Sequence, residues 1–131
     1  MQLTHKAIQA IVPFITPFVV EGNLFDTARQ FSEDYTGGSW EATTMGEHTF
    51  AVAPDGEYNV VNPDNYFSGA MDHYTYGAAI TLLVYNRLLW WYAENHPDRF
   101  NDSLSDAFYA MKDAALSDKR VNAGLLYSFL D

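Results

Sequence analysis

The chain has 131 residues, a length that suits one domain with one hydrophobic core. Hydrophobic residues make up 48% of it and aromatic residues 16%, a composition that excludes a disordered chain. The absence of Cys excludes disulfides and thiolate metal sites, and it fits a protein of the cytosol.

The charge of the chain is strongly negative, with 17 acids against 7 bases and a net charge of −10. Between Gln30 and Asn86 there is no Lys or Arg at all. Contact with a nucleic-acid backbone needs positive charge to displace counterions, so direct nucleic-acid binding is not expected. Two interpretations of the acids remain. They keep a small protein soluble, or they face the basic DNA-binding surface of another protein.

Neither an export signal nor a membrane span is predicted. Pro13 and Pro17 interrupt the apolar run over residues 8–20, which argues against a signal peptide. The longest apolar block, residues 78–93, contains Arg87 and is shorter than the ~20 residues that a membrane span needs. We therefore expect a cytoplasmic protein, with this block as a buried helix.

The N-terminal part of the chain favours two helices. Residues 4–11 form the first, with Thr4 as its N-cap, and Pro13 and Pro17 then force an irregular path. Residues 23–35 form the second, with Asn23 as its N-cap and an apolar stripe at spacings of three and four. The stripe consists of Leu24, Ala28, Phe31 and Tyr35. Gly37 and Gly38 end this helix, and one of them is expected to take a left-handed conformation.

The middle of the chain alternates with period two, which predicts strands with one buried face. These strands cover residues 40–44, 49–54 and 57–61, with a short edge strand near residues 66–68. The connections at residues 45–48 and 54–57 are short and rich in turn residues, so neighbouring strands should be antiparallel and form a meander. Trp40, Phe50 and Tyr58 fall on the buried face.

The C-terminal half predicts three helices. The main one covers residues 72–94, with Trp90 and Trp91 widening an apolar face that leaves little polar surface. Another runs from Ser103 or Ser105 to about Leu116, and the last covers residues 121–130. The fold class is therefore α+β, a small antiparallel sheet of three to four strands packed against four to five helices.

No catalytic, cofactor-binding or metal-binding pattern is present. The chain lacks HExxH, a P-loop, GxGxxG and GxSxG, and His5, His48, His73 and His96 are scattered. A hydrolase or a small-ligand binder would require a pocket with converging polar groups. The remaining aromatics are candidates for an exposed patch that suits a protein partner. They are Tyr66, Tyr74, Tyr76 and Trp91.

Four segments in a fixed order carry a family resemblance. They are Asp34-Tyr35-Thr36-Gly37-Gly38-Ser39-Trp40, Phe50-Ala51-Val52-Ala53-Pro54, Asn65-Tyr66-Phe67-Ser68-Gly69 and the stretch from Tyr76 to Asn86. Over residues 25–86 this set resembles the ArdB/KlcA antirestriction proteins. The chain departs from their pattern at Thr36 and Ser39, and at residues 46–48, where the family usually has Asn-Gly-Gly. The departure at residues 46–48 affects any partner contact that this turn makes.

The resemblance implies a single antirestriction domain over residues 1–131, encoded by a phage, a plasmid or a genomic island. Such a protein protects incoming DNA against type I restriction-modification by contacting a host protein, such as the restriction-modification complex, without catalysis. The alternative is an acidic DNA mimic that inhibits a nucleic-acid-binding defence protein. The oligomeric state is not indicated by the sequence.

The candidate partner contacts are exposed polar residues near the motifs, namely Glu33, Asp34, Glu41, Glu47, His48, Asp55 and Glu57. The motif residues themselves are predicted mainly to build the fold. These are Asp34, Tyr35, Gly37, Gly38, Trp40, Pro54 and Gly69. Glu33 and Asp34 are expected at a solvated helix end.

Overall fold

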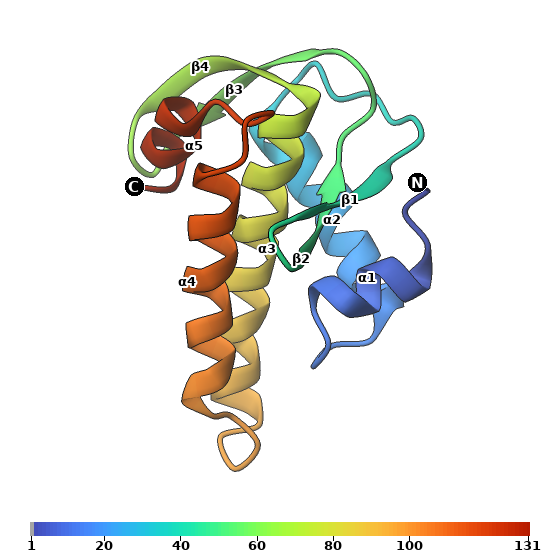
Figure 1. Cartoon of the computed structure of the whole chain (residues 1–131), viewed down its shortest axis with the longest axis vertical. Coiled ribbons are helices and arrows are strands. Elements are labelled where there is room, and N and C mark those ends of the chain that lie inside the picture. Colours follow the sequence, from blue (N-terminus) through green and yellow to red (C-terminus); the bar gives the residue numbers. More distant parts are fainter. Residues whose placement is uncertain (1) are drawn as a thin grey trace.

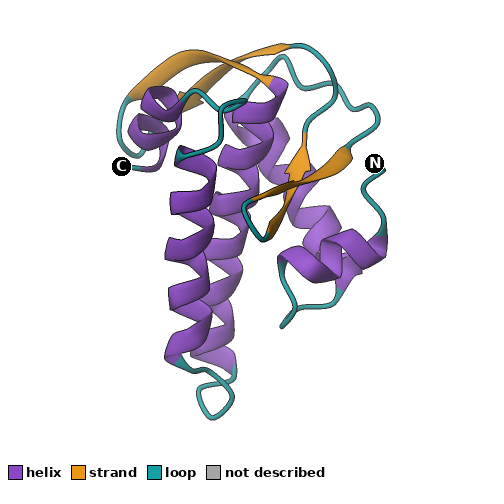
Figure 2. Ribbon diagram, viewed as in Figure 1, coloured by secondary structure: helices purple, strands orange, loops and turns teal. Residues whose placement is uncertain are grey.

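The structure is a computed structural model that describes residues 2–131, and within them the chain forms five helices and four strands. The elements are α1 (His5–Ile11), α2 (Pro17–Phe31), β1 (Glu41–Met45), β2 (His48–Val52), β3 (Glu57–Asn62), β4 (Phe67–Asp72), α3 (His73–Asn95), α4 (Asp102–Leu116) and α5 (Ala123–Leu130). Two long helices, α3 and α4, lie side by side (Figure 1). The strands form two separate pairs (Figure 2). The predicted α+β class is confirmed.

The first two helices begin where local capping chemistry places them. Thr4 caps α1 by accepting a hydrogen bond from the amide of Ala7 at 3.2 Å, as predicted. The predicted start of α2 is wrong, because the helix begins at Pro17. Proline suits a first helical turn, where its missing N–H has no partner to lose. Asn23 therefore lies inside α2 and donates to the carbonyl of Val19 at 2.9 Å.

The main helix α3 is buried along most of its length but not at its end. Asp72 caps it by accepting from the amide of Thr75 at 2.8 Å. The prediction of a buried helix is wrong near the C-terminus of α3, where Trp90 is 64% exposed and Trp91 48%. Of the aromatics proposed for an exposed patch, Tyr76 is completely buried.

The predicted single meander is wrong, because the four strands form two antiparallel pairs. Strand β1 pairs with β2, and β3 pairs with β4. Between β2 and β3, no pairing occurs in the described part of the chain. The connection turns away from β2 at Pro54, whose carbonyl accepts from the Tyr58 hydroxyl at 2.6 Å. Strand β4 is also longer than the predicted edge strand and leads directly into α3.

Helix α3 approaches β2 closely at Gly77. A Cβ on this residue would lie 2.4 Å from the carbonyl oxygen of Ala51, so only glycine fits the contact. One turn later, the Thr81 hydroxyl donates to the Gly77 carbonyl at 2.7 Å and accepts from the Ala51 amide at 3.2 Å. The lack of a side chain at Gly77 therefore lets β2 approach α3 closely, and the Thr81 hydroxyl bonds the two elements together.

The core lies around α3. Trp40, Phe50 and Tyr58 are buried as predicted, and the rings of Tyr58 and Tyr76 stack at 4.6 Å between centroids. The predicted apolar stripe of α2 is buried as well. Among residues 2–131, no helix combines the length and the apolar character needed to cross a bilayer.

The last two helices are capped by asparagines, and the serine cap predicted for α4 is wrong. Asn101 accepts from the amide of Ser103 at 3.0 Å at the start of α4, and Asn122 accepts from the amide of Leu125 at 3.1 Å at the start of α5. Between them, Arg120 donates to Asp118 and to the carbonyl of Thr44, at 2.9 Å and 2.8 Å. This arginine ties the connection between α4 and α5 to β1.

Candidate functional site

The two consecutive glycines between α2 and β1 both take positive φ angles, where one was predicted. Gly37 has φ +100° and Gly38 has φ +119°, a conformation that other residues adopt at a cost. A Cβ on Gly38 would lie 3.1 Å from the side chain of Pro54. The turn therefore packs on the end of the first strand pair.

This turn brings Trp40 back onto Tyr35. The Trp40 indole donates through Nε1 to the Tyr35 hydroxyl at 3.0 Å, and the two ring centroids lie 5.8 Å apart. Both side chains are buried. Gly69 is constrained in a similar way, because a Cβ there would lie 2.9 Å from the ring of Phe67. These motif residues make contacts that build the fold.

The sequence predicts Asp34 at a solvated helix end. This prediction is wrong, because α2 already ends at Phe31. Its carboxylate accepts two hydrogen bonds from Asn59, from the backbone amide at 2.7 Å and from Nδ2 at 3.0 Å. The loop after α2 is thereby fixed to the outer face of β3. Glu57 lies two residues from Asn59 on the same exposed face, a separation of about 7 Å along a strand.

Asp55 joins this region from the connection between β2 and β3. Its carboxylate lies 3.5 Å from Nδ1 of His73, the first residue of α3. We call the group formed by Glu33, Asp34, Asp55 and Glu57 the acidic edge. Beside it, a groove of about 530 Å³ runs between the end of α2 and β3, with Glu33 and Asp34 in its lining.

The other candidate contacts lie elsewhere. Glu41 begins β1, opposite Val52 and in a bridge with Gln2. Glu47 lies in the hairpin turn at the other end of β1 and His48 begins β2 directly after it, about 14 Å from Glu41 at the usual rise of a strand. The structure therefore brings four of the seven candidates together and separates the hairpin turn from them.

Two buried tyrosines near the acidic edge are structural groups. Burial raises the pKa of the Tyr58 phenol. Burial raises the pKa of the Tyr76 phenol more strongly, and the neighbouring Tyr58 and Tyr35 add to the effect. Both therefore stay protonated, and Tyr76 donates to the carbonyl of Ala28 at 2.5 Å. Within residues 2–131, no group of three or more His, Asp or Glu side chains is placed to hold a metal ion.

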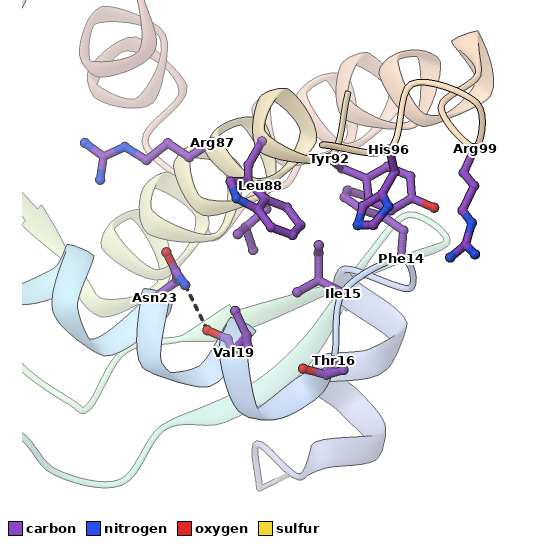
Figure 3. Close-up of a pocket in the computed structure, with 11 residues that line it drawn as sticks. Phe14, Ile15, Thr16, Val19, Asn23, Arg87, Leu88, Tyr92, His96 and Arg99 are labelled. Atoms are coloured by element: carbon purple, nitrogen blue, oxygen red, sulfur yellow. Dashed lines mark hydrogen bonds between the residues drawn. The ribbon is translucent and has the colours of Figure 1, made fainter. Parts of the chain in front are cut away.

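A larger cleft, which sequence reasoning missed, lies between the start of α2 and the C-terminal half of α3 (Figure 3). It has a volume of about 610 Å³. The lining residues are Phe14, Ile15, Thr16, Val19, Asn23, Arg87, Leu88, Trp91, Tyr92, His96 and Arg99. Among these described residues none is Asp or Glu, so the cleft offers no carboxylate for acid–base work. The signal in the sequence was the Trp pair followed by bases in an otherwise acidic chain.

The model of the antirestriction protein family matches residues 33–128. The chain belongs to the antirestriction protein family. The matched range begins at the acidic edge, includes the glycine turn, both strand pairs and α3, and ends within α5.

Two similar proteins extend this result. The chain is 29% identical over 97 residues to the putative antirestriction protein YubI of Escherichia coli strain K12; the match covers 73% of the chain and 65% of that relative. It is also similar to a solved structure of the KlcA and ArdB proteins, with a TM-score of 0.77 and 17% identity over 96% of this chain and 87% of the other. Those proteins have a novel fold and antirestriction activity against type I DNA restriction systems in vivo but not in vitro. The resemblance predicted from the motifs is confirmed.

Proposed function

We propose that this antirestriction protein protects incoming phage or plasmid DNA by countering type I restriction-modification of the bacterial host. It acts as one domain over residues 1–131, through contacts with a host protein and without catalysis. The observation that carries the proposal is the family match over residues 33–128, joined to the fold shared with KlcA and ArdB.

The acidic edge is the part of the surface that we assign to the host partner. Asp34 accepts two hydrogen bonds from Asn59, so this carboxylate has a defined position before any partner arrives. Preorganised charges lose less conformational entropy on binding. A partner with a basic surface, such as a subunit of a type I restriction-modification complex, would be attracted to this edge.

The activity of the KlcA and ArdB proteins in vivo but not in vitro supports a partner that is present in the cell. A protein that acts through a further component of the host cell would be inactive in an assay that contains only the restriction system and DNA.

Phage plating tests the proposal. Unmodified phage is plated on a host with a type I system, with and without this protein, and on the same host lacking the restriction subunit. We expect plating efficiency to rise only on the restricting host. An unchanged efficiency, with the protein shown to be folded and expressed, would refute the antirestriction function.

The acidic edge is tested in the same assay by charge reversal. The double variant Glu33→Lys with Glu57→Lys should lose most of the protection, because both exposed side chains would then repel a basic partner. Asp106→Lys, at an exposed position of α4, is the matched control and should protect normally. Full protection by the double variant would assign the contact to another surface.

DNA mimicry is the second candidate, favoured by the stretch from Phe31 to Tyr85 that has eight acids and no base. A mimic needs carboxylates in a row at phosphate spacing, whereas Glu47 lies at the hairpin turn, away from the acidic edge. Mimicry predicts direct binding to the purified restriction enzyme that weakens steeply as salt rises. Binding that is absent or insensitive to salt would exclude it.

A further inference from the structure

The cleft between α2 and α3 has a chemistry opposite to that of the acidic edge. Its floor is apolar and aromatic, and its ends carry bases. Figure 3 shows Arg87 at one end and Arg99 at the other, with His96 near Arg99. The chain has seven Lys and Arg residues in all, and two of them line this one cleft, which contains no described acid.

The aromatic floor is held in place by ring contacts. Phe14, from the turn between α1 and α2, packs on Tyr85 and Tyr92 with centroids 5.4 Å and 5.0 Å apart. The ring centroid of His96 lies 5.2 Å from that of Tyr92 and 5.7 Å from that of Trp91. The floor is therefore preformed, which lowers the entropic cost of binding.

The rim of the cleft exposes apolar side chains that a solvated surface would not favour. Val19 from α2 and Trp91 from α3 line the cleft and are each about half exposed. Their sequence neighbours Phe18 and Trp90 are 77% and 64% exposed. Phe18 and Trp90 do not line the cleft, so its own exposed apolar groups are Val19 and Trp91. An exposed Trp at a concave surface is typical of binding sites for other proteins.

The dimensions of the cleft suit a short helix. Its α2 wall, from Thr16 to Asn23, is about 10 Å long, and its α3 wall, from Arg87 to His96, is about 14 Å long at 1.5 Å per residue. Two to three turns of an amphipathic helix match this length and would present apolar anchors at spacings of three, four and seven residues.

We propose that this cleft docks an amphipathic helix of a partner protein, with apolar anchors on one face and acidic residues toward its ends. The apolar face contacts Trp91, Leu88 and Val19, while the acids pair with Arg99 and His96 at one end and Arg87 at the other. This site is separate from the acidic edge, lies about 20–35 Å along α3 from its N-terminus, and does not depend on the antirestriction function.

Charge argues against two other occupants. In a symmetric contact with a second copy, the cleft would face itself, and cations would meet cations in either direction. Single-stranded nucleic acid could stack on Trp91, but the arginines stand only at the two ends of the cleft, so the apolar floor between them offers no cation to successive phosphates.

Fluorescence titration tests the proposal with the purified full chain. The probe is a capped, labelled helical peptide of about 15 residues with Leu or Phe at i, i+4 and i+7 and Glu near both ends. A second peptide replaces each Glu with Lys. We expect the acidic peptide to bind at least about tenfold more tightly than the basic one at low salt, as charge complementarity requires.

Variants locate the binding. Arg99→Glu should weaken the acidic peptide about fivefold or more, because an ion pair becomes a repulsion, whereas Lys119→Glu, at an exposed position outside the cleft, should not. Trp91→Ala should weaken it about tenfold or more as loss of an aromatic anchor. Tyr109→Ala, an exposed aromatic on α4, is the matched control. Circular dichroism verifies that each variant is folded.

Three results would overturn the proposal. The first is equal binding of the acidic and basic peptides, or no binding of either. The second is displacement of the acidic peptide by a single-stranded oligonucleotide. The third is a dimer in sedimentation that Trp91→Ala dissociates, since the cleft would then be occupied by a second copy. Plating efficiency is not measured here, so a negative result would leave the antirestriction proposal standing.

Discussion

The contact between α3 and β2 at Gly77 makes a specific prediction about stability. In Gly77→Ala the new Cβ would lie 2.4 Å from the Ala51 oxygen, 2.8 Å from the Val52 Cα and 2.9 Å from the Ala53 nitrogen. All three are backbone atoms, so relief requires β2 to move away from the helix. Overpacking of this kind costs about 3 kcal/mol, and the better helix propensity of Ala returns about 1 kcal/mol, so we expect a net loss of about 2 kcal/mol.

Gly22→Ala is the matched control. Gly22 is also inside a helix, α2, but it is exposed, and a Cβ added to it would meet no atom within 4 Å. There the propensity gain is unopposed, and the free energy of unfolding should rise by about 0.5–1 kcal/mol. Urea unfolding measures both variants, with a midpoint about 1 M lower for Gly77→Ala at a typical urea dependence. A Gly77→Ala variant as stable as the wild type would refute the close approach.

Three further variants test individual contacts by urea unfolding. Tyr35→Phe should cost about 1–3 kcal/mol, because it leaves the buried indole N–H of Trp40 without its acceptor; no loss would argue against this bond. Hydrogen bonds from Arg120 lower the pKa of Asp118 in the folded state, so their stabilisation is present above the ordinary pKa of about 3.9 and is lost as pH falls through the folded value. Asp118→Asn should therefore cost about 1 kcal/mol at pH 7, and the difference from wild type should vanish in acid. Burial raises the pKa of Tyr85 to about 12, so its contribution is complete below pH ~10 and is lost as pH rises toward 12; Tyr85→Phe should flatten this alkaline loss.

The elements that were predictable from the sequence are those specified by short-range patterns. The alternation of β1, β2 and β3 and the long apolar helix α3 required only local periodicity, and the Thr4 cap required only its own neighbours. The predicted start of α2 is wrong because Asn23 is a residue type that favours a helix cap, whereas Pro17 occupies the position that a proline favours in a first turn.

The pairing of the strands could not be predicted in the same way. The connection around Pro54 has the length and residues of a hairpin, yet the chain turns away, with the Pro54 carbonyl bound to Tyr58 and the Ala53 amide bound to the carbonyl of His73. These partners lie on other elements, so only the assembled fold selects them. The exposure of Trp90 and Trp91 likewise depends on the assembled fold, namely on how far along α3 the packing of α2 extends.

The candidate site was predictable in composition but not in arrangement. The acidic residues were identified from the charge pattern, whereas the bond from Asn59 that fixes Asp34 joins residues 25 positions apart. The cleft was missed because its walls come from α2 and α3, whose relative position no local pattern encodes. Its bases were visible in the sequence only as isolated exceptions in an acidic chain.

The hydroxyl of Thr81 has a consequence for solubility. A two-stranded sheet leaves outward-pointing amides that can recruit a strand from another molecule. The amide of Ala51 on β2 donates to the Thr81 hydroxyl, and the amide of Ala53, directly after the strand, donates to the carbonyl of His73. Helix α3 thus occupies the position where a third strand would pair. The helix thus protects this edge against intermolecular pairing, so the molecule can reach a high concentration without assembling through this edge of its own sheet.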